Sequence, residues 1–510
     1  MQLRQLLQDV EYAIIQGAKE GEQLDVRHVV YDSRRVGEGD LFVCLTGWKT
    51  DGHAFIKEAW ENGAAAFVVE KLVRHGEAIV FPKEAVVILV RDSREEFAHI
   101  SAAYFGNPAR QLKVIGVTGT KGKTTVTWML RTLLERAGHR TGLIGTIETI
   151  IGEERIPSEN TTPESFTIQK YFAKMVEEGC EYAVMEVSSQ GIKQKRVEGI
   201  PFLAAVFTNF GEDHIGPGEH ENMEEYRYYK SCLFRQCRIG IGNLDDLQCS
   251  YMFRYSTCEK YGYTCQKDYF SYLYDRKEKV LTAEQIRFQM EKGRPVTCFL
   301  LRGERLALEM PGLFNVYNAL AALATVQALG IEIPEMADTV RQMSVKGRTE
   351  LVTTDKNIAC YIDYAHNAMS LMVVLGTIRG YQPGRIILVF GCGGNRAVSR
   401  RTKMGEVAGR LADLTVITSD NPRYEEPLSI MEDIRKGIAG TGGEYVMVED
   451  RRRAVEFALD TARPGDVVLI AGKGHETYQE IRGVKYPMDD RELVRLAVLK
   501  HRGRKDIQKN

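Results

Sequence analysis

The chain of 510 residues has no CxxC pair, no long uncharged apolar run and almost no net charge. Its ten cysteines are scattered, the closest two being Cys232 and Cys237, which excludes a zinc ribbon or a dense disulfide framework and favours reduced, mostly buried thiols. A net charge of -1 argues against nucleic acid as a partner, because backbone binding needs a basic surface. Any anionic ligand must therefore be held by local charge.

The sequence also shows no pattern typical of a targeting signal or a membrane-spanning segment. The start, MQLRQLLQDVEYAII, is interrupted by charges before the apolar region of a signal peptide can develop. No other stretch approaches the roughly 20 apolar residues of a membrane span. We therefore expect a cytoplasmic protein without a membrane span, and a monomer as its simplest state.

Apolar runs separated by charged or helical stretches predict an α/β fold in three domains. The N-terminal domain, 1–98, should be a small α/β unit, the central domain, 99–342, a parallel sheet with a phosphate loop, and the C-terminal domain, 343–510, Rossmann-like. A helix is expected over 428–440. The expected strands are 40–45, 65–69, 86–90, 113–119, 182–189, 203–210, 385–391, 414–420 and 467–472.

The stretch 114-VIGVTGTKGKTTVTWML-130 reads as a strand, a glycine-rich loop and a helix that stops near Gly138. Glycines let backbone N–H groups converge on phosphate, Lys123 would supply a cation to the β and γ oxygens, and Thr124 could bind Mg²⁺. Val117 stands where the common GxxxxGK[ST] pattern has glycine, so the loop is a variant. The alternative is a tight turn without a ligand.

Three further residues carry chemistry that the sequence leaves open. Glu186 ends an apolar strand and is either a hard oxygen ligand for Mg²⁺ or a solvated cap. His214, after another apolar strand, is either a structural histidine or a metal ligand. Lys230, taken alone, reads as a solvated cation on a helix.

A set of ordered motifs resembles the Mur ligase family, whose members build the peptide of bacterial cell-wall precursors. The resemblance covers nearly the whole chain and is closest for the branch that adds the third residue to UDP-MurNAc-L-Ala-D-Glu. It implies an ATP-driven amide ligase that forms an acyl phosphate and then expels phosphate as an amine attacks. The motifs are GTKGKTT, 160-NTTPE-164, 186-EVSSQGIKQKR-196, 207-FTNFGEDH-214, 224-EEYRYYKSCLF-234, 311-PGLFNVYNALAAL-323, 363-DYAH-366, 391-GCGGNR-396, 420-DNPR-423 and 472-GKGHE-476.

The resemblance assigns the catalytic machinery residue by residue. It implies that Lys123, Glu186, His214 and Lys230 are catalytic, and that Lys230 takes up CO₂ as a carbamate beside a second Mg²⁺. The implied metal ligands are Thr124, Glu186, His214 and Lys230. The implied ATP contacts are Gly119, Thr120, Lys121, Gly122, Lys123, Thr124, Thr125 and Asn315.

For the nucleotide-sugar substrate, the resemblance implies contacts to UDP-MurNAc-dipeptide from Ser33, Asn160, Thr161, Thr162, Ser188, Gln194 and Arg196. Hydroxyl and amide donors suit a sugar and a peptide, and an arginine fork suits a carboxylate. Thr162 could instead be an N-cap and Arg196 a surface residue. Trp48 stands at a variable position, where it could stack on uracil or cover the edge of a core.

The C-terminal domain should select the incoming amino acid. DNPR resembles the signature of ligases that use meso-diaminopimelate, whose distal carboxylate would pair with Arg423; otherwise Arg423 lies in an Asn-Pro turn. The implied contacts are Arg401, Asp420, Asn421, Pro422, Arg423, Gly472 and Glu476. The alternatives are a family ligase with another acceptor, such as L-lysine or a folate-polyglutamate substrate, a phosphate-loop NTPase that does conformational work, and an idle binding protein.

The chain departs from the family pattern in two places. The stretch from Asp213 to Lys230 runs two residues longer than usual, and within it DHIGPGEH replaces the common DHLDYHG, close to the implied metal ligands His214 and Lys230. Lys121 stands where the family usually has asparagine. The sequence does not explain this second cation beside the phosphates.

Overall fold

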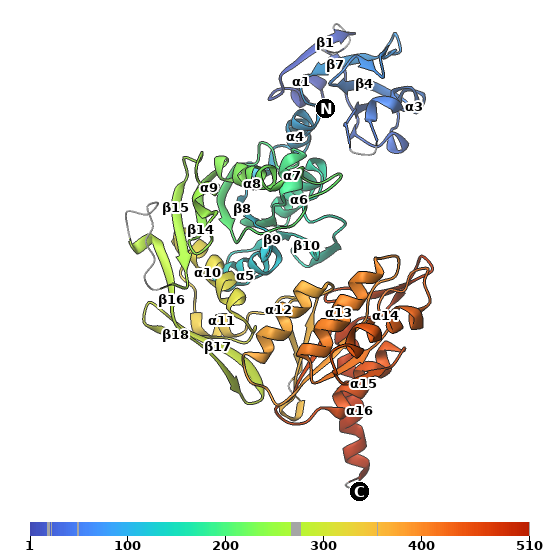
Figure 1. Ribbon diagram of the computed structural model, residues 1–510. Helices are drawn as coiled ribbons and strands as arrows, with labels where there is room; N and C mark the ends of the chain where they lie inside the picture. Colours follow the sequence, from blue (N-terminus) through green and yellow to red (C-terminus); the bar gives the residue numbers. More distant parts are fainter. Residues whose placement is uncertain (18–20, 22, 48–49, 267–276, 354, 509–510) are drawn as a thin grey trace. The chain divides into compact units, whose positions relative to one another are not determined.

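The computed structural model describes residues 1–17, 21, 23–47, 50–266, 277–353 and 355–508 (Figure 1). By their internal contacts these residues form two compact units. The first holds the described residues of 1–263, 277–280 and 321–332, and the second those of 264–266, 281–320 and 333–508. The three expected domain ranges stay predictions, since contacts group the chain differently around 264–332.

The first sheet of unit one has the strand order β1-β7-β4-β3-β2, with β1 antiparallel and the other neighbours parallel. Alternate residues of its strands feed two apolar cores, one on each face, as expected for buried parallel strands. The elements are α1 (Leu3–Leu6), β1 (Tyr12–Gln16), β2 (Val29–Val30), β3 (Asp40–Val43), α3 (Ile56–Glu61), β4 (Ala64–Val69), the small hairpin β5 (Val73–Arg74) and β6 (Glu77–Ala78), β7 (Val86–Val90) and α4 (Ser93–Tyr104).

The second sheet of unit one runs β11-β10-β9-β12-β8-β13-β14-β15, and its six strands from β9 to β15 in this order are parallel. The carboxyl ends of β8, β12 and β13 therefore lie side by side. Its strands are β8 (Lys113–Thr118), β9 (Thr141–Ile144), β10 (Glu148–Ile151), β11 (Glu154–Pro157), β12 (Tyr182–Glu186), β13 (Phe202–Phe207), β14 (Cys237–Asn243) and β15 (Glu259–Thr264). Its helices are α5 (Lys123–Arg136), α6 (Ser165–Glu177), α7 (Ser189–Lys193), α8 (Met223–Cys232) and α9 (Cys249–Met252).

Unit two contains an antiparallel set, β16 (Val280–Glu291), β17 (Arg294–Leu301) and β18 (Glu304–Leu308), and a mostly parallel sheet in the order β19-β20-β24-β21-β22-β23. The remaining strands are β19 (Glu350–Thr353), β20 (Ala359–Asp363), β21 (Ile386–Phe390), β22 (Leu414–Ile417), β23 (Tyr445–Met447), β24 (Val467–Ala471), β25 (Tyr478–Ile481) and β26 (Val484–Pro487). The helix α10 (Leu313–Ala328) is divided between the units, with 313–320 in unit two and 321–328 in unit one. The other helices of unit two are α11 (Met336–Arg341), α12 (Ala368–Arg379), α13 (Val398–Leu411), α14 (Pro427–Ala439), α15 (Arg451–Thr461) and α16 (Asp490–Gln508).

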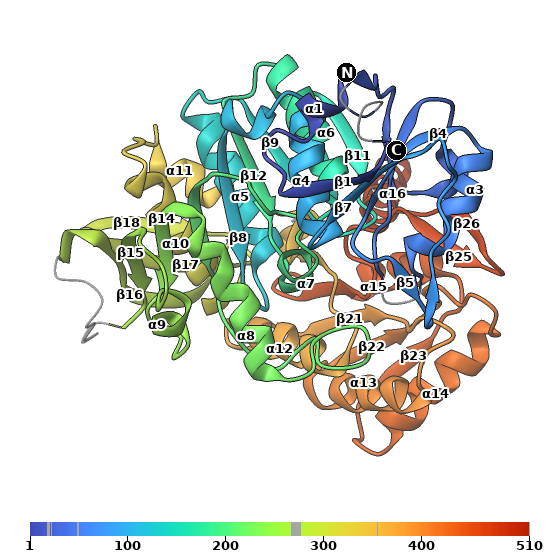
Figure 2. The ribbon, with the colours of Figure 1, turned by 90° about the horizontal axis from the view of Figure 1, so that it is seen from above.

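The mostly parallel sheet of unit two is covered on both faces (Figures 1 and 2). On one face α12, α13 and α14 pack against one set of alternating strand residues. On the other, α15 and the first turns of α16 pack against the intervening set. This is the Rossmann-like arrangement that the sequence predicted.

The α/β class with three sheets is confirmed, and every expected strand is present within a few residues. The strands expected at 182–189, 203–210 and 414–420 each end three residues early, and the first of them stops at Glu186 because Ser188 caps the short helix α7. The expected helix over 428–440 is α14, one residue earlier at both ends. Among the described residues, no helix is long and apolar enough to cross a membrane.

Candidate active site

The phosphate loop joins the carboxyl end of β8 to α5. Gly119 has φ +145° and Gly122 has φ +87°, two conformations that side chains disfavour. A Cβ on Gly119 would lie 1.9 Å from Oγ1 of Thr208, so only glycine fits there. The Lys123 ammonium folds over the loop and donates to the carbonyls of Gly119, at 2.9 Å, and Thr120, at 3.1 Å. The loop is thus closed around its own lysine.

We expect Gly119→Ala to destabilise the protein by about 2 to 4 kcal/mol, because it adds a clash to a strained backbone angle. It should also weaken binding of an ATP analogue by more than about tenfold. Gly138→Ala is the matched control, since Gly138 also has a positive φ of +88° but has no atom within 4 Å of the added Cβ. Urea unfolding and calorimetric titration would decide, and equal stability and affinity of the two variants would contradict the packing described.

Glu186 is held at the end of β12 by three hydrogen bonds and is 1% exposed. Its carboxylate accepts from Thr124 Oγ1 at 3.0 Å, from the Thr146 backbone N–H at 2.7 Å and from Thr146 Oγ1 at 3.0 Å. A Cβ on Gly145 would come within 2.5 Å of Oε1, so that glycine leaves room for the carboxylate. A solvated cap is therefore the wrong interpretation of Glu186, which instead faces the first turn of α5.

Lys230 is buried on α8, with 1% exposure, and is not the solvated cation that sequence alone suggested. Its ammonium donates to the carbonyl of Gly119 at 2.9 Å and lies 4.4 Å from the ring centroid of Tyr226. Burial and the nearby Lys123 hold the pKa of Lys230 well below its usual value, although Asp213 opposes this. Burial raises the pKa of Tyr226 to about 12, and its hydroxyl lies 3.2 Å from Thr120 Oγ1.

His214 follows β13 with a left-handed backbone, φ +56°, and an imidazole that is 46% exposed. Its Nδ1 lies 3.2 Å from Glu219 Oε1 and its Nε2 lies 3.9 Å from Asp213 Oδ2. Among the described residues, no three His, Cys, Asp or Glu side chains gather in a geometry suited to a metal ion. The assignment of His214 as a metal ligand stays a prediction.

The expected dipeptide contacts gather around the start of α7. Thr162 Oγ1 donates to the Glu186 carbonyl at 3.0 Å and lies 3.1 Å from Ser188 Oγ, which caps α7. Thr162 is not an N-cap, because α6 begins later, with Glu164 in the cap position. Arg196 donates to the Thr162 carbonyl at 2.7 Å. Thr161 reaches Thr146 Oγ1 at 3.0 Å, Gln194 ends α7, and Asn160 is exposed.

The remaining nucleotide candidates are placed as follows. Ser33 is buried, and its hydroxyl donates to Glu58 at 3.1 Å. Asn315, in α10, is buried, and its amide donates to the Pro311 carbonyl at 2.9 Å and to Thr349 Oγ1 at 3.2 Å. Trp48 lies outside the described residues.

In unit two, the DNPR and GKGHE motifs meet at the carboxyl ends of β22 and β24. Asn421 Nδ2 donates to Glu476 Oε2 at 2.9 Å, and the buried Lys473 ammonium donates to Asn421 Oδ1 at 3.0 Å and to Glu476 Oε2 at 2.8 Å. A Cβ on Gly472 would lie 2.8 Å from Asp420 Oδ2, so the glycine admits that carboxylate. The two motifs therefore form one hydrogen-bonded cluster.

Arg423 and Arg401 occupy different environments. Arg423 has φ +54°, and its Nε donates to Glu480 at 3.1 Å and its Nη1 to the Gly394 carbonyl at 2.8 Å. Arg401 is 2% exposed and is held by Glu425, at 2.7 and 2.8 Å, and by Asp433, at 3.1 Å. Arg401 thus braces the turn that follows the DNPR motif, while Arg423 keeps part of its guanidinium accessible.

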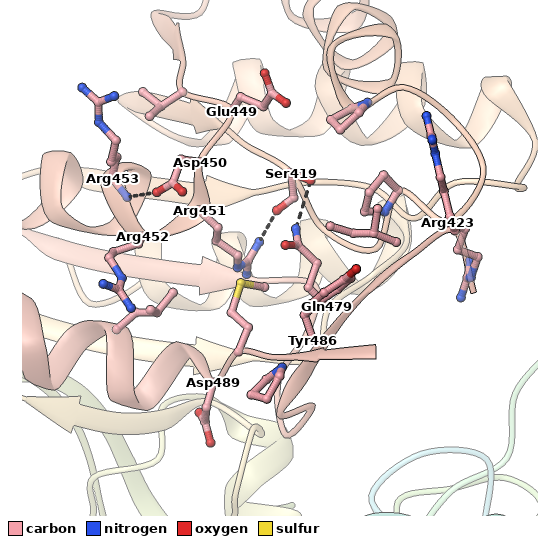
Figure 3. Close-up of a pocket in the computed structure, with 18 of the residues that line it drawn as sticks. Ser419, Arg423, Glu449, Asp450, Arg451, Arg452, Arg453, Gln479, Tyr486 and Asp489 are labelled. Carbon is pink, nitrogen blue, oxygen red and sulfur yellow. Dashed lines mark hydrogen bonds between the residues drawn. The ribbon is translucent and has the colours of Figure 1, made fainter. Parts of the chain in front are cut away.

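A groove of about 1300 Å³ lies beside this cluster, between the β25–β26 hairpin and the start of α15 (Figure 3). Of the expected acceptor contacts, Pro422 and Arg423 line it, and Arg423 stands at its margin, away from Arg451 and Arg452. Arg451 is fully buried and paired with Asp490 at 2.7 Å, so it supports the groove rather than offering a free charge.

Sequence reasoning missed three residues that complete these clusters. Thr146 and Tyr226 lie in no phosphate motif, and only the folded sheet brings them to Glu186 and Thr120. Lys473 stands inside the GKGHE motif, where a lysine flanked by two glycines could have signalled close packing.

Comparison with known proteins supplies the family. Three models match successive parts of the chain: "Mur ligase family, catalytic domain" at residues 25–105, "Mur ligase middle domain" at 117–326 and "Mur ligase, glutamate ligase domain" at 347–474. Two relatives are named UDP-N-acetylmuramoyl-L-alanyl-D-glutamate--2,6-diaminopimelate ligase. That of Caldanaerobacter subterraneus subsp. tengcongensis is 40% identical over 97% of this chain and 98% of its own, and that of Clostridium botulinum is 39% identical over 97% and 99%.

A solved structure of the same name agrees with these relatives. It is 28% identical and has a TM-score of 0.69, covering 98% of this chain and 99% of its own. Its similarity extends over both units and all three matched segments. The chain therefore belongs to the Mur ligase family.

Proposed function

We propose that the protein is the ATP-dependent ligase, MurE in type, that joins meso-diaminopimelate to the D-glutamate of UDP-MurNAc-L-Ala-D-Glu in peptidoglycan precursor synthesis. The observation that carries this is the arrangement of Lys123, Thr124 and Glu186 at one edge of the central sheet, in a chain that matches such ligases over nearly its whole length. The cytoplasm and a monomeric state remain our expectations, with no nucleic-acid partner.

The donor set around Glu186 fits Mg²⁺. A hydroxyl of Thr124 lies 3.0 Å from the buried carboxylate, and both are hard oxygen ligands. Thr124 and Glu186 would hold the first ion, and His214 and Lys230, the latter as its carbamate, the second. Bound Mg²⁺ would neutralise phosphate oxygens as charge develops on them. Phosphate oxygens of the nucleotide would complete the coordination shell of Mg²⁺, because the protein supplies few oxygen ligands at this site.

The remaining groups position the reacting carboxylate and phosphate. Glycine N–H groups of the loop and the Lys123 ammonium, released from the loop carbonyls, would bind the β and γ phosphates. Ser188 and Arg196 would orient the dipeptide so that its D-glutamate carboxylate meets the γ-phosphate. Catalysis of this kind depends on positioning and on charge neutralisation more than on covalent chemistry by the protein.

The DNPR and GKGHE cluster would receive the amino acid. Arg423 would pair with the distal carboxylate and Glu476 with an ammonium, its second oxygen being held by Lys473 and Asn421. L-Lysine has no distal carboxylate and would leave the Arg423 guanidinium without this partner.

Phosphate release tests the proposal directly. With ATP and Mg²⁺, we expect release only when both UDP-MurNAc-L-Ala-D-Glu and meso-diaminopimelate are present, because the acyl phosphate needs the acid and turnover needs the amine. Omitting either substrate is the internal control. Release that is independent of both would instead indicate a phosphate-loop NTPase, and no release under any condition would indicate an idle binding protein.

A further inference from the structure

The stretch Asp213–His220, here called the connecting turn, carries the sequence DHIGPGEH, which departs from the family pattern. It closes on itself: the Gly216 N–H donates to the His220 carbonyl and the His220 N–H to the His214 carbonyl, both at 3.1 Å. Ile215 and His220 form a parallel bridge, and Gly218 turns the chain with φ +80°. The departing sequence therefore forms a turn that is closed by its own backbone hydrogen bonds.

One end of the connecting turn is tied to the phosphate loop. Lys121 Nζ donates to Asp213 Oδ2 at 2.8 Å. The Lys121 backbone is fixed in turn, since its N–H donates to Asn209 Oδ1 at 2.9 Å and its carbonyl accepts from Thr208 Oγ1 at 2.6 Å. The two departures from the family pattern, Lys121 and the longer turn, therefore contact each other.

The other end of the connecting turn is tied to α7. Gln190 Nε2 donates to the Gly218 carbonyl at 2.9 Å, and Lys193 Nζ donates to the Glu219 carbonyl at 3.0 Å. His220 is fully buried, with Nε2 2.9 Å from Ser189 Oγ and its ring 5.2 Å from that of Tyr226. The connecting turn therefore contacts three residues of α7, the helix whose two caps, Ser188 and Gln194, are expected dipeptide contacts.

We propose that the connecting turn is a positioning element that couples nucleotide binding to dipeptide binding, with Lys121 and Gln190 as its two contact residues. The proposal rests on the proposed function, which places ATP at the phosphate loop and the dipeptide at α7. When a phosphate of ATP binds beside Lys121, the Lys121 ammonium gains a second anionic partner in addition to Asp213. The Lys121–Asp213 contact then holds the connecting turn in one arrangement, and the contacts of the turn with α7 hold that helix as well. By linkage, each ligand then strengthens binding of the other.

The size of this coupling is bounded by the contacts that carry it. The Lys121 side chain is 70% exposed, and exposed ion pairs contribute little. We therefore expect a coupling of about fivefold through the turn, at the low end of known values. If the turn had a purely structural role, substitutions in it would change its stability without changing the coupling between the two ligands.

The test is the ratio of dissociation constants for UDP-MurNAc-L-Ala-D-Glu, measured by calorimetry without and with a saturating non-hydrolysable ATP analogue and Mg²⁺. The parent protein should show a ratio of about five or more. Lys121→Asn and Gln190→Ala should each bring the ratio below about two, and Lys121→Arg, which keeps the cation, should retain it. Lys113→Met is the matched control, because it breaks the ion pair with Glu181 at the opposite end of β8.

Unchanged ratios in both Lys121→Asn and Gln190→Ala would overturn the coupling, as would a ratio of one in the parent. A loss of ratio in Lys113→Met as well would overturn it too, since the effect would then not be specific to the turn. Failure of the proposed function is distinguishable, because phosphate release by the parent would then not require UDP-MurNAc-L-Ala-D-Glu together with meso-diaminopimelate, whatever the ratio of dissociation constants.

Discussion

Replacing Lys230 with alanine should abolish ligation, lowering kcat by at least about a thousandfold, as expected when a group that stabilises charge at the reacting centre is removed. Added short carboxylates should restore part of the rate by standing in for the missing carbamate. The measurement is phosphate release with all substrates present, across a series of acetate or formate concentrations.

The physical reason lies in the surroundings of Lys230. An amine must be neutral to attack CO₂, and burial beside Lys123 holds the pKa of Lys230 well below its usual value, which favours the neutral form. The side chain already reaches the phosphate loop through the Gly119 carbonyl, at 2.9 Å. A carbamate at this position would therefore replace a cation with an anionic oxygen ligand close to the nucleotide.

Lys230→Met is the matched control for folding, because it keeps the length of the buried side chain without the amine. It should unfold at nearly the same temperature as the parent and remain inactive. Activity within about threefold of the parent in Lys230→Met would contradict a catalytic role. Inactivity without any rescue by carboxylates would contradict the carbamate and leave a catalytic amine.

Arg423→Ala should raise KM for meso-diaminopimelate by about ten- to a hundredfold, the range expected for loss of a hydrogen-bonded charge, with KM for ATP unchanged. In the parent, L-lysine and L-ornithine should support turnover at least about a thousandfold less well, since they leave the Arg423 guanidinium without a carboxylate. Steady-state kinetics with the three amino acids in parallel measures both effects.

The geometry of Arg423 explains why this residue should discriminate between meso-diaminopimelate and L-lysine. Glu480 holds its Nε and the Gly394 carbonyl holds its Nη1, and Nη2 has no hydrogen-bond partner within the described part of the chain. A distal carboxylate could bind there without displacing either contact. Arg482→Ala is the control, because Arg482 is 79% exposed on the β25–β26 hairpin, which carries Glu480. Equal use of lysine by the parent, or an unchanged KM in Arg423→Ala, would contradict the assignment.

Much of the fold follows from local pattern alone. Buried parallel strands are continuous apolar runs, so β7, β8, β21 and β24 could be located within a residue or two. The phosphate loop could be predicted in the same way, because GTKGKTT encodes a backbone geometry, with Gly119 and Gly122 at positive φ. Such features depend on neighbours in sequence.

The environment of Lys230 could not be predicted in this way. Lys230 contacts Gly119 and Tyr226, and Gly119 is more than a hundred residues away in sequence. Nothing in the composition around Lys230 distinguishes this lysine from a solvated lysine on a helix. Only the family resemblance singled it out. The contact between Thr146 and Glu186 is similar, since it exists only because β9 and β12 are neighbours in the sheet.

The link between Lys121 and Asp213 was hidden for the same reason. Each departure from the family pattern was visible in the sequence, but their contact depends on how β8 and β13 bring the phosphate loop and the connecting turn together. Pairing of two unusual residues is a three-dimensional property, and a single sequence without relatives carries no sign of it.

The most direct test of ATP-driven amide formation follows the carboxylate oxygens of the substrate. UDP-MurNAc-L-Ala-D-Glu with ¹⁸O in its D-glutamate carboxylates is incubated with the protein, ATP, Mg²⁺ and meso-diaminopimelate. An acyl phosphate transfers one oxygen of the activated carboxylate to the released phosphate. The expected result is therefore ¹⁸O-labelled phosphate and a tripeptide product that has lost one labelled oxygen, both read by mass spectrometry. Unlabelled phosphate, or a substrate that keeps all its label while ATP is consumed, would contradict an ATP-driven amide ligase.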